Sequence, residues 1–512
     1  MKQPVLVRIL CVLLCLVGWE TLSAQKIITY SAGMGTRDPE NADVWILYQR
    51  VRAEHEGMVL YADSALLNTE QNDFTAYGHI KIELTDTTTI YGDRLYYDGI
   101  SRVVDIWADT VRLIDGKTIL KTNHLSYDRN TSTATYNNWG YTVNEDKSLV
   151  SRVGHYNSDI KTFYIYVQVV LQDSNMRLET DTLTYCTEDH IAEFSSPTYI
   201  YSDSSILYSE NGSYNTETRY AYSTKSSRVQ NMEKILSCDT LHYYEATEFG
   251  RAIGHVVLED TVNKIICMGR YGESDRVRQT SYVTDSALVK FVGKDENNAD
   301  APQDTLYLHA DSIRVINNEN KEFTALNAFY HVKAFRTDGQ AMCDSAHYSV
   351  LDSLLQLYGN PVLWYGDYQC TADTIEMYHG SDGPTIAYMR NNSINAEQLD
   401  PAKFNQIKGR NSEGHFLKGE PNYADILGNA EMVYYITDED SGRVSVVGVN
   451  VGQGSDMRIY FKDRSPERVV TSGNPDMNAY PLDNLDPEKS TLQGFRWLDA
   501  RRPKSPGDVF VW

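Results

Sequence analysis

The chain repeats a phrase of about thirty residues, and this repeat limits the possible folds more than any other feature of the sequence. Residues 60–83 read LYADSALLNTEQNDFTAYGHIKIE, and residues 90–115 read IYGDRLYYDGISRVVDIWADTVRLID. A unit of this size cannot bury its apolar face alone, so the copies are expected to stack on one another. The Asp of the phrase, or its substitute, recurs at Asp63, Asp93, Asn123, Gly154, Asp181, Asn211, Asp239, Gly269, Asp311, Asp344 and Asp373.

Apolar residues alternate with polar ones on both sides of the recurrent Asp, but the phase changes across it. Leu60 and Ala62 precede Asp63 by three and one positions, whereas Ala65 and Leu67 follow it by two and four. A period of two predicts strands. A change of phase predicts a bulge or bend that keeps both flanks facing one interior. We therefore interpret the recurrent Asp as a corner and not as an acid catalyst.

The second run of the unit predicts another strand with one apolar face. In residues 74–83, Phe74, Ile80 and Ile82 share a face, and Lys81 and Glu83 lie on the other. The same pattern returns in residues 250–259. His79 and His255 share the parity of the charged residues, so we expect both to be solvated. The sequence therefore predicts an all-β protein built from stacked strand–turn–strand units.

Composition shifts divide the chain into five predicted segments. Residues 1–24 combine a cationic start, a short apolar run and a small-residue exit, which is typical of a secretory signal peptide. Repeats fill 25–292 and 305–464, and the polar stretch 293–304 is expected to be a surface loop or linker. The Pro-rich segment 465–512 is expected to lack the repeat and to dock over the last strands or against a partner.

Charge and cysteine usage exclude several classes of function. The formal net charge is −23 and the sequence pI is about 4.9, which disfavours nucleic acid as a partner. Cys238 and Cys343 occupy the slot before the recurrent Asp, where other copies have Ala, Gly or Thr, so they are expected to be small buried residues. We predict no cofactor and no metal site.

The recurring segments resemble those of the LptA/OstA family of lipopolysaccharide transport. The matching stretches are 61–65, 76–82, 92–98 and 123–128, and the long OstA-like members are the most similar. The resemblance implies an elongated, twisted, antiparallel β-jellyroll with a V-shaped trough for lipid A acyl chains. It also implies that modules stack end to end between the two membranes, and that the protein is not an enzyme.

The inward positions of the first units are the candidate lipid-binding residues. Lipopolysaccharide or a related glycolipid is the expected ligand, held through acyl chains at about 0.8 kcal/mol per buried methylene. Other lipopolysaccharide-transport proteins are expected to bind by edge-to-edge strand addition in the periplasm, with or without outer-membrane association. Whether these side chains line a groove or simply fill a core stays open. The candidates are Leu60, Ala65, Leu67, Phe74, Ile80, Ile82, Leu95 and Tyr97.

Three other classes compete with this reading. A non-enzymatic β-repeat scaffold or adhesin would bind protein or glycan along the same surface. A parallel β-helix, with or without lyase activity, would have shorter and more regular coils. The terminal residues 509–512, VFVW, suggest an outer-membrane barrel, but about six residues follow Pro506 and a spanning strand needs about nine to eleven.

Overall fold

A computed structural model describes residues 27–293, 305–380, 383–418, 420–440, 443–463, 465–482 and 487–512. The predicted signal peptide, 1–24, lies outside the described residues, as do residues 294–304 of the polar stretch. The chain divides into two compact units, Met1–Ser202 and Asp203–Trp512. The described part contains no helix with the length and hydrophobicity that a membrane crossing requires.

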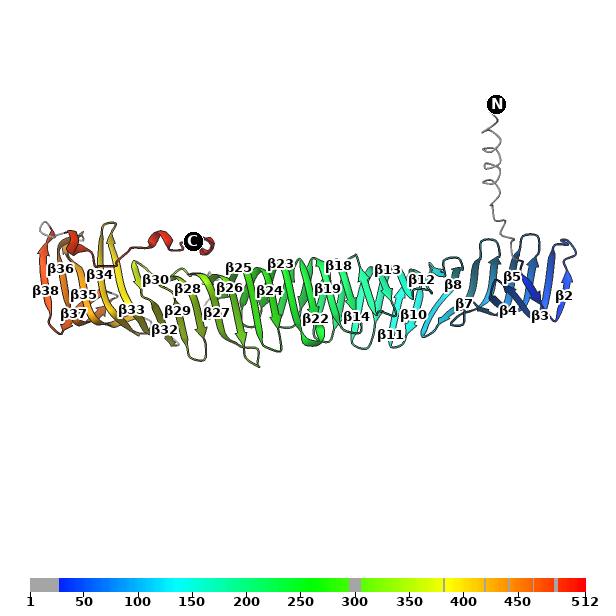
Figure 1. Ribbon diagram of the computed structural model, residues 1–512, viewed down its shortest axis with the longest axis horizontal. Helices are drawn as coiled ribbons and strands as arrows, with labels where there is room; N and C mark the ends of the chain where they lie inside the picture. The colour runs from blue at the N-terminus through cyan, green and yellow to red at the C-terminus, as the bar shows by residue number, and fades with distance from the viewer. Residues whose placement is uncertain are drawn as a thin grey trace, which may run out of the picture. The chain divides into compact units, whose positions relative to one another are not determined.

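The first unit consists of strands joined mostly by short turns (Figure 1). Its strands are β1 (Thr29–Ser31), β2 (Met34–Arg37), β3 (Val44–His55), β4 (Met58–Asn68), β5 (Asp73–Glu83), β6 (Thr88–Asp98), β7 (Val103–Asp115), β8 (Thr118–Asp128), β9 (Thr133–Tyr136), β10 (Gly140–Asn144), β11 (Lys147–Ser151), β12 (Val153–Asn157), β13 (Thr162–Gln172), β14 (Met176–Cys186), β15 (Ile191–Phe194) and β16 (Thr198–Ser202).

The second unit continues the same pattern and ends in short 3-10 helices. Its elements are β17 (Ile206–Ser209), β18 (Asn211–Asn215), β19 (Tyr220–Lys225), β20 (Ser227–Gln230), β21 (Lys234–Cys238), β22 (Thr240–Tyr244), η1 (Glu245–Thr247), β23 (Phe249–Asp260), β24 (Ile265–Asp275), β25 (Thr280–Val292), β26 (Thr305–Asn317), β27 (Phe323–Phe335), β28 (Gln340–Ser349), β29 (Leu354–Tyr358), β30 (Val362–Tyr365), β31 (Tyr368–Thr371), β32 (Thr374–Gly380), β33 (Gly383–Asp400), β34 (Lys403–Leu417), β35 (Glu420–Asp440), β36 (Arg443–Lys462), β37 (Ser465–Ser472), β38 (Asp476–Pro481), η3 (Pro487–Ser490), η4 (Asp499–Arg501) and η5 (Pro506–Phe510).

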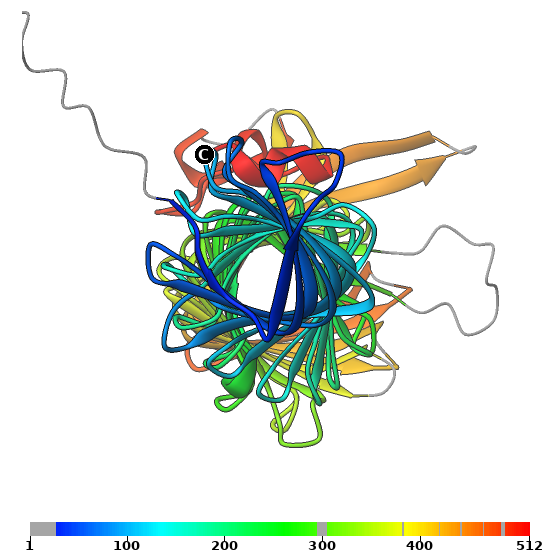
Figure 2. The same cartoon turned by 90° about the vertical axis from the view of Figure 1, so that its right-hand side faces the viewer.

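Each unit is a jellyroll of bent antiparallel strands, which confirms the predicted fold class. Within the first unit, β4 pairs with β5, β5 with β6, and β6 with β7, all antiparallel. Within the second unit, β23 to β28 pair in chain order in the same way. Figure 2 shows the strands curving around an interior. Antiparallel pairing between consecutive strands rules out a parallel β-helix for these segments.

The recurrent Asp lies at the bend, as the change of phase predicted. Leu60, Ala62, Ala65 and Leu67 are all buried, so the alternation shifts across Asp63. The neighbouring strand β5 supplies the matching bulge, because the register of β5 with β6 slips between Tyr77 and Ile80. A bulge of this kind sharpens the local bend and twist. The bends allow one strand to contribute to both walls of the interior.

His79 and His255 are solvated as predicted, but each also pairs with the corner Asp of the preceding strand. Their side chains are 92% and 91% exposed. The Nδ1 atom of His79 lies 2.6 Å from Asp63 Oδ2, and that of His255 lies 2.7 Å from Asp239 Oδ2. The hydrogen bond and charge of Asp63 raise the pKa of His79 above 6.5. The sequence pattern alone did not predict these pairs.

Replacing Gly78 by Ala is expected to destabilise this corner by about 1–3 kcal/mol. Gly78 has a φ of +74°, and an added Cβ would lie 2.4 Å from Asp63 Oδ2. Gly57→Ala is the matched control, because Gly57 has a φ of +85° but no atom within 4 Å of an added Cβ. Hydrogen exchange of residues 60–83 would measure the difference. Equal losses in the two variants would contradict a steric role for Asp63.

The stretch 293–304, expected to be a surface loop or a linker, lies between two strands that pair with each other. Strands β25 and β26 pair directly, with Val292 opposite Thr305, so the polar stretch connects adjacent strands of one ladder. The chain divides instead between Ser202 and Asp203.

The strands also continue beyond residue 464, where we expected the tail to begin. Strands β37 and β38 pair with β36 and extend the sheet to Pro481. Pro466 lies near the start of β37, and Pro481 is the last residue of β38. Prolines are compatible with edge strands and strand ends, because those positions need not donate a ladder hydrogen bond. Proline content was therefore a poor guide to the end of the repeat.

The C-terminal tail, residues 487–512, folds back along strands β26 to β36 (Figure 1). Gln406 and Gln369 each hold its backbone with both amide atoms. Gln406 accepts from Leu492 N at 2.9 Å and donates to the Ser490 carbonyl at 3.0 Å. Gln369 accepts from Leu498 N at 2.7 Å and donates to the Arg496 carbonyl at 2.7 Å.

Apolar side chains anchor the same tail. Leu492 packs with Val433, Tyr435 and Val449. Leu498 packs against Met342, Val362 and Trp364, and Val509 is fully buried. Near the terminus, the centres of the Phe510 and His309 rings lie 4.6 Å apart, and the centre of the Trp512 ring lies 5.5 Å from Lys333 Nζ. The expected docking of the tail over the last strands is therefore seen within the second unit, and it reaches back as far as β26.

Candidate functional site

The eight predicted groove residues all point into the interior of the first unit. They come from β4, β5 and β6 and form rows across the strands. One row aligns Leu67, Phe74 and Tyr97, and another aligns Ala65 with Leu95 through Ala76. In the other half of the bent strands, Leu60 lies opposite Ile82, and Ile80 lies opposite Gly92. The structure therefore gathers the candidates on the two walls of one apolar interior.

This interior is closed to water at the candidate positions. Exposed fractions are 1% for Leu60, 2% for Ala65, 1% for Leu67, 1% for Phe74, 1% for Ile80, 0% for Ile82, 0% for Leu95 and 1% for Tyr97. The two walls also touch near the bend, because a Cβ added to Gly92 would lie 2.5 Å from Ile106 Cγ1. In this state the eight side chains are core residues, and a ligand could reach them only if the walls separated.

A small cavity of about 10 Å³ interrupts the packing of the second unit. It is large enough for about one water molecule and not for a hydrocarbon chain. Its lining mixes apolar and polar side chains: Lys234, Leu258, Asp260, Ile265, Cys267, Ser281, Val315 and Asn317. Within the described residues, no group of three or more His, Cys, Asp or Glu side chains could hold a metal ion.

The thiols in the interior are buried, as the slot before the corner predicted for Cys238 and Cys343. Burial raises the pKa of Cys238, Cys267 and Cys343 from 9.0 to about 12. The nucleophilic thiolate is therefore scarce near neutral pH. Because folding raises the pKa of these thiols, their protonated forms favour the folded state. This contribution to folding stability is fully present below pH 9 and is lost as the pH rises toward 12.

We expect these three thiols to react with iodoacetamide at least a hundredfold more slowly at pH 8 in the folded protein than in urea. Mass spectrometry of the alkylated peptides would measure each rate. Partly exposed Cys186 is the internal control, and it should react faster than Cys238. Equal rates for Cys186 and Cys238 in the folded protein would contradict the closed interior.

Opposite the bends, two sets of hairpin turns meet along a line that we call the mouth. Successive turns alternate between the two ends of the bent strands, so each wall of the interior ends in its own set. Glu56, in the turn between β3 and β4, forms one contact across the mouth. Its carboxylate lies 2.8 Å from Arg102 Nη2, and its carbonyl accepts from Arg129 Nη2 at 3.0 Å. Arg129 also donates to the Tyr97 hydroxyl at 2.9 Å.

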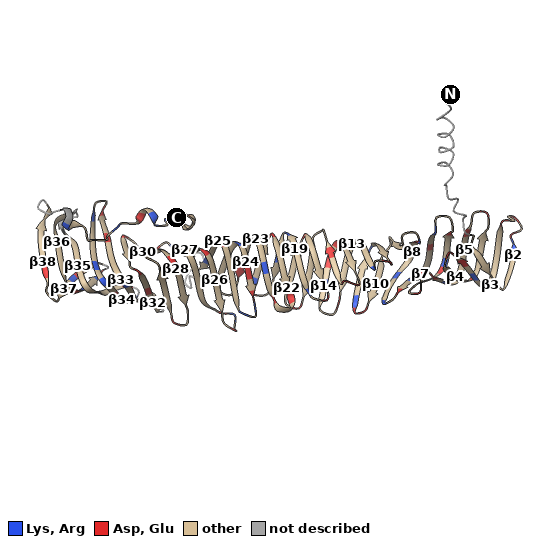
Figure 3. Ribbon diagram, in the orientation of Figure 1, with Lys and Arg blue, Asp and Glu red and all other residues tan. Residues whose placement is uncertain are grey.

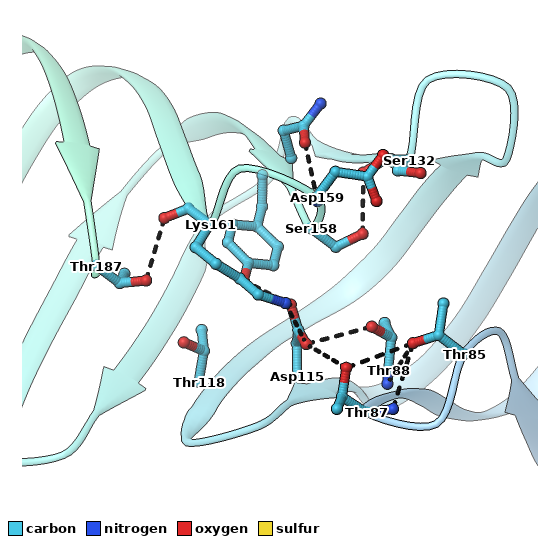
Figure 4. A network of polar contacts seen from close by, with 12 residues as sticks. Thr85, Thr87, Thr88, Asp115, Thr118, Ser132, Ser158, Asp159, Lys161 and Thr187 are labelled. Atoms are coloured by element: carbon cyan, nitrogen blue, oxygen red, sulfur yellow. Dashed lines mark hydrogen bonds and ion pairs between the residues drawn. The ribbon is translucent and has the colours of Figure 1, made fainter. Parts of the chain in front are cut away.

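A second contact across the mouth centres on Asp115 at the end of β7 (Figure 4). Its side chain is 0% exposed, and its Oδ2 atom lies 2.7 Å from Lys161 Nζ, which belongs to the opposite set of turns. The Tyr156 hydroxyl donates to Asp115 Oδ2 at 2.7 Å, and the hydroxyls of Thr87 and Thr88 donate to Oδ1 at 3.2 Å. Burial and the neighbouring Asp115 carboxylate raise the pKa of Tyr156, so the phenol stays protonated and donates.

The second unit has a corresponding contact. Lys321 Nζ, in the turn before β27, lies 2.8 Å from Glu233 Oε1 in the turn before β21. Asn263 donates to the Lys321 carbonyl at 3.1 Å and accepts from Phe323 N at 3.1 Å. These three sets of contacts, centred on Glu56, Asp115 and Glu233, are the mouth clasps. They close the interior through side chains, whereas neighbouring strands are joined by backbone ladders.

Sequence reasoning missed the mouth clasps because they lie in turns, which the apolar pattern treats as solvated connections. A weak signal was present. Arg102 and Lys161 each come immediately before the first residue of a strand, and Lys321 comes two residues before one. All three have positive φ, at 63°, 51° and 67°. The sequence alone does not indicate which acidic residue each one meets.

Comparison with known proteins identifies the family. A family model described as OstA-like protein matches residues 25–181 and 164–239. A second model, described as LptA/(LptD N-terminal domain) LPS transport protein, matches residues 296–382. The chain belongs to the LptA/OstA-like family. The two models together cover strands of both units, and this lipopolysaccharide-transport family was the one the recurring segments resembled.

A solved structure is also similar to part of this LptA/OstA-like chain. It is that of LptH, the LptA homologous periplasmic component of the conserved lipopolysaccharide transport device from Pseudomonas aeruginosa. The match has 12% sequence identity and a TM-score of 0.21, and covers 28% of this chain and 92% of that chain. A search of curated proteins found no match.

Proposed function

We propose that the protein shelters the acyl chains of lipopolysaccharide, or of a related glycolipid, between the two walls of its jellyroll. The observation that carries this proposal is the pair of apolar walls whose free ends are held by side-chain clasps. Buried hydrocarbon would contribute about 0.8 kcal/mol per methylene, while sugars and phosphates remained in water at the mouth. Family membership supports the same conclusion.

Loading requires the mouth to open, because the walls are packed together in the closed state. Breaking a clasp separates hairpin turns without breaking the backbone hydrogen bonds of the ladder. An acyl chain entering between the walls would then replace the contacts that the walls lose with each other. This exchange keeps apolar surface away from water in both states. The protein is proposed to act in this way in the periplasm and without enzymatic activity.

Exposed strand edges support docking to other transport proteins. Among the described strands, β1 and β2 pair with β3 alone, and β37 and β38 pair with β36 alone. Their outer edges offer unpaired backbone groups to a partner strand. We propose that related jellyroll modules add at these edges and so bridge components of the envelope.

Photo-crosslinking from inside the jellyroll tests the lipid-binding function. A photoreactive residue at Leu95 or Ile80 should form adducts with lipopolysaccharide after incubation with delipidated protein. Tyr96 is the matched control for Leu95, because it is the next residue along the same strand and points outward. Deacylated lipopolysaccharide should give no adduct at Leu95, Ile80 or Tyr96.

A scaffold that binds protein or glycan on its surface predicts the opposite result. In that case the interior positions Leu95 and Ile80 would give no lipopolysaccharide adduct in a folded protein. Adducts of equal yield at Tyr96 and Leu95 would indicate nonspecific association. Either result would reject the acyl-sheltering function.

A further inference from the structure

A row of basic and aromatic residues crosses the outer face of the first unit. We call Arg52, Tyr61, Lys81, Tyr91, Arg112, Lys121 and Tyr141 the cation–aromatic row. Each member lies directly opposite the next on the neighbouring strand, from β3 through β8 to β10. At about 4.8 Å per strand the row extends over roughly 30 Å.

The row contains four cations and no acidic residue, although the chain has 70 acidic and 47 basic residues. Elsewhere basic and acidic residues are interspersed along both units (Figure 3). Arg112 and Lys121 also lie directly opposite each other. Like charges in this position destabilise a sheet, so sheet stability alone does not account for the pair.

Arg112 and Lys121 are neighbouring members of the row, on β7 and β8. Both are exposed, and neither has an acidic side chain within ion-pair distance in the described part of the chain. The positions two residues away along their strands are Thr110, Ile114, Ile119 and Asn123, none of which is acidic. By contrast, Glu54 and Glu83 lie on the same strands as the other two cations and neutralise Arg52 at 2.8 Å and Lys81 at 2.6 Å.

Aromatic rings flank both Arg112 and Lys121. The Arg112 guanidinium lies 5.2 Å from the centre of the Tyr91 ring, and Lys121 Nζ lies 5.9 Å from the centre of the Tyr141 ring. Tyr141 is 44% exposed, so its side chain is accessible to a ligand. Aromatic faces pack against the C–H surfaces of sugar rings, and Arg beside Lys provides several donors for a phosphate group.

We propose that the cation–aromatic row binds a phosphate-bearing oligosaccharide, with phosphate at Arg112 and Lys121 and sugar against Tyr91 and Tyr141. The row is one residue wide, which suits an extended glycan better than a flat membrane surface. The net charge of −23 opposes binding to a large anionic surface, but it does not prevent a local contact of this kind. The net charge had hidden this basic row from the sequence analysis.

This proposal is independent of acyl sheltering, because the row lies on the outer face and the apolar walls lie inside. The test therefore uses a water-soluble probe. Fluorescently labelled phosphorylated oligosaccharide, prepared by complete deacylation of lipopolysaccharide, is titrated with the folded chain at low salt. The Arg112→Gln/Lys121→Gln double variant should raise the dissociation constant at least tenfold, and enzymatic removal of the phosphates should do the same.

Lys290→Gln is the matched control, because Lys290 Nζ lies 5.8 Å from the centre of the Tyr307 ring in the second unit and Lys290 is not a member of the row. It should change the dissociation constant less than twofold. Circular dichroism should show that all variants keep their strand content. Unchanged binding by the double variant, or equal binding of the dephosphorylated probe, would overturn the proposal. Retention on phosphatidylglycerol vesicles that depends on Arg112 and Lys121, without oligosaccharide binding, would overturn it in favour of a membrane contact.

Discussion

Removal of the tail, residues 487–512, is expected to lower the free energy of opening of strands β28 to β36 by more than about 4 kcal/mol. The tail buries Leu492 and Val509 and covers a partly apolar outer face. Each buried aliphatic side chain contributes about 1.5–3 kcal/mol, and each hydrogen bond to the tail adds about 1 kcal/mol. Native-state hydrogen exchange of these strands would measure the loss.

Single substitutions separate the role of the tail from the effect of shortening the chain. Gln369→Ala and Gln406→Ala keep the tail but remove its backbone contacts, and each should cost about 2 kcal/mol. Gln356→Ala is the control, because Gln356 bonds Glu376 at 3.1 Å on the sheet and does not contact the tail. If the truncated chain kept its hydrogen-exchange protection, the tail would contribute no stability to these strands.

Replacement of Asp115 by Ala is expected to destabilise the first unit by about 3 kcal/mol. The change leaves the Lys161 ammonium without its buried partner and removes the acceptor of the Tyr156, Thr87 and Thr88 hydroxyls. The side chain of Lys161 is 26% exposed, so solvent offsets part of the cost. Hydrogen exchange in β5 to β8 would measure the change in stability.

Asp146→Ala is the matched control for Asp115→Ala. Asp146 pairs with Lys147 at 3.1 Å, but its side chain is 65% exposed. An exposed pair of this kind contributes about 0–1 kcal/mol. If the two variants lost the same stability, burial would not be what makes the Asp115 clasp strong. The mouth would then be held closed by its apolar contacts.

The sequence predicted the bent strands because their determinants are local. The change of phase around Asp63 requires an irregularity within one strand, and Leu60, Ala62, Ala65 and Leu67 already specify which face is buried. The same reasoning identified the eight interior positions. It could not show that the walls are packed together, because that depends on how two halves of distant strands meet.

The features that the sequence did not predict join residues far apart in the chain. Lys161 lies 46 positions from Asp115, and Gln369 lies 127 positions from Arg496. In both cases the partner is set by stacking geometry and not by a repeating pattern. Gln369 and Gln406 also occupy outward positions, where alternation predicts solvated side chains, and only the returning tail explains their burial.

Pairing between strands that are close neighbours in sequence has a consequence for biogenesis. A chain that crosses a membrane unfolded can add each hairpin to the stack as that hairpin emerges, without waiting for distant partners. The tail contacts form last, since they need residues from the extreme end of the chain. A chain that lacked the tail would expose the apolar side chains around Trp364. Such a chain would be more susceptible to proteolysis.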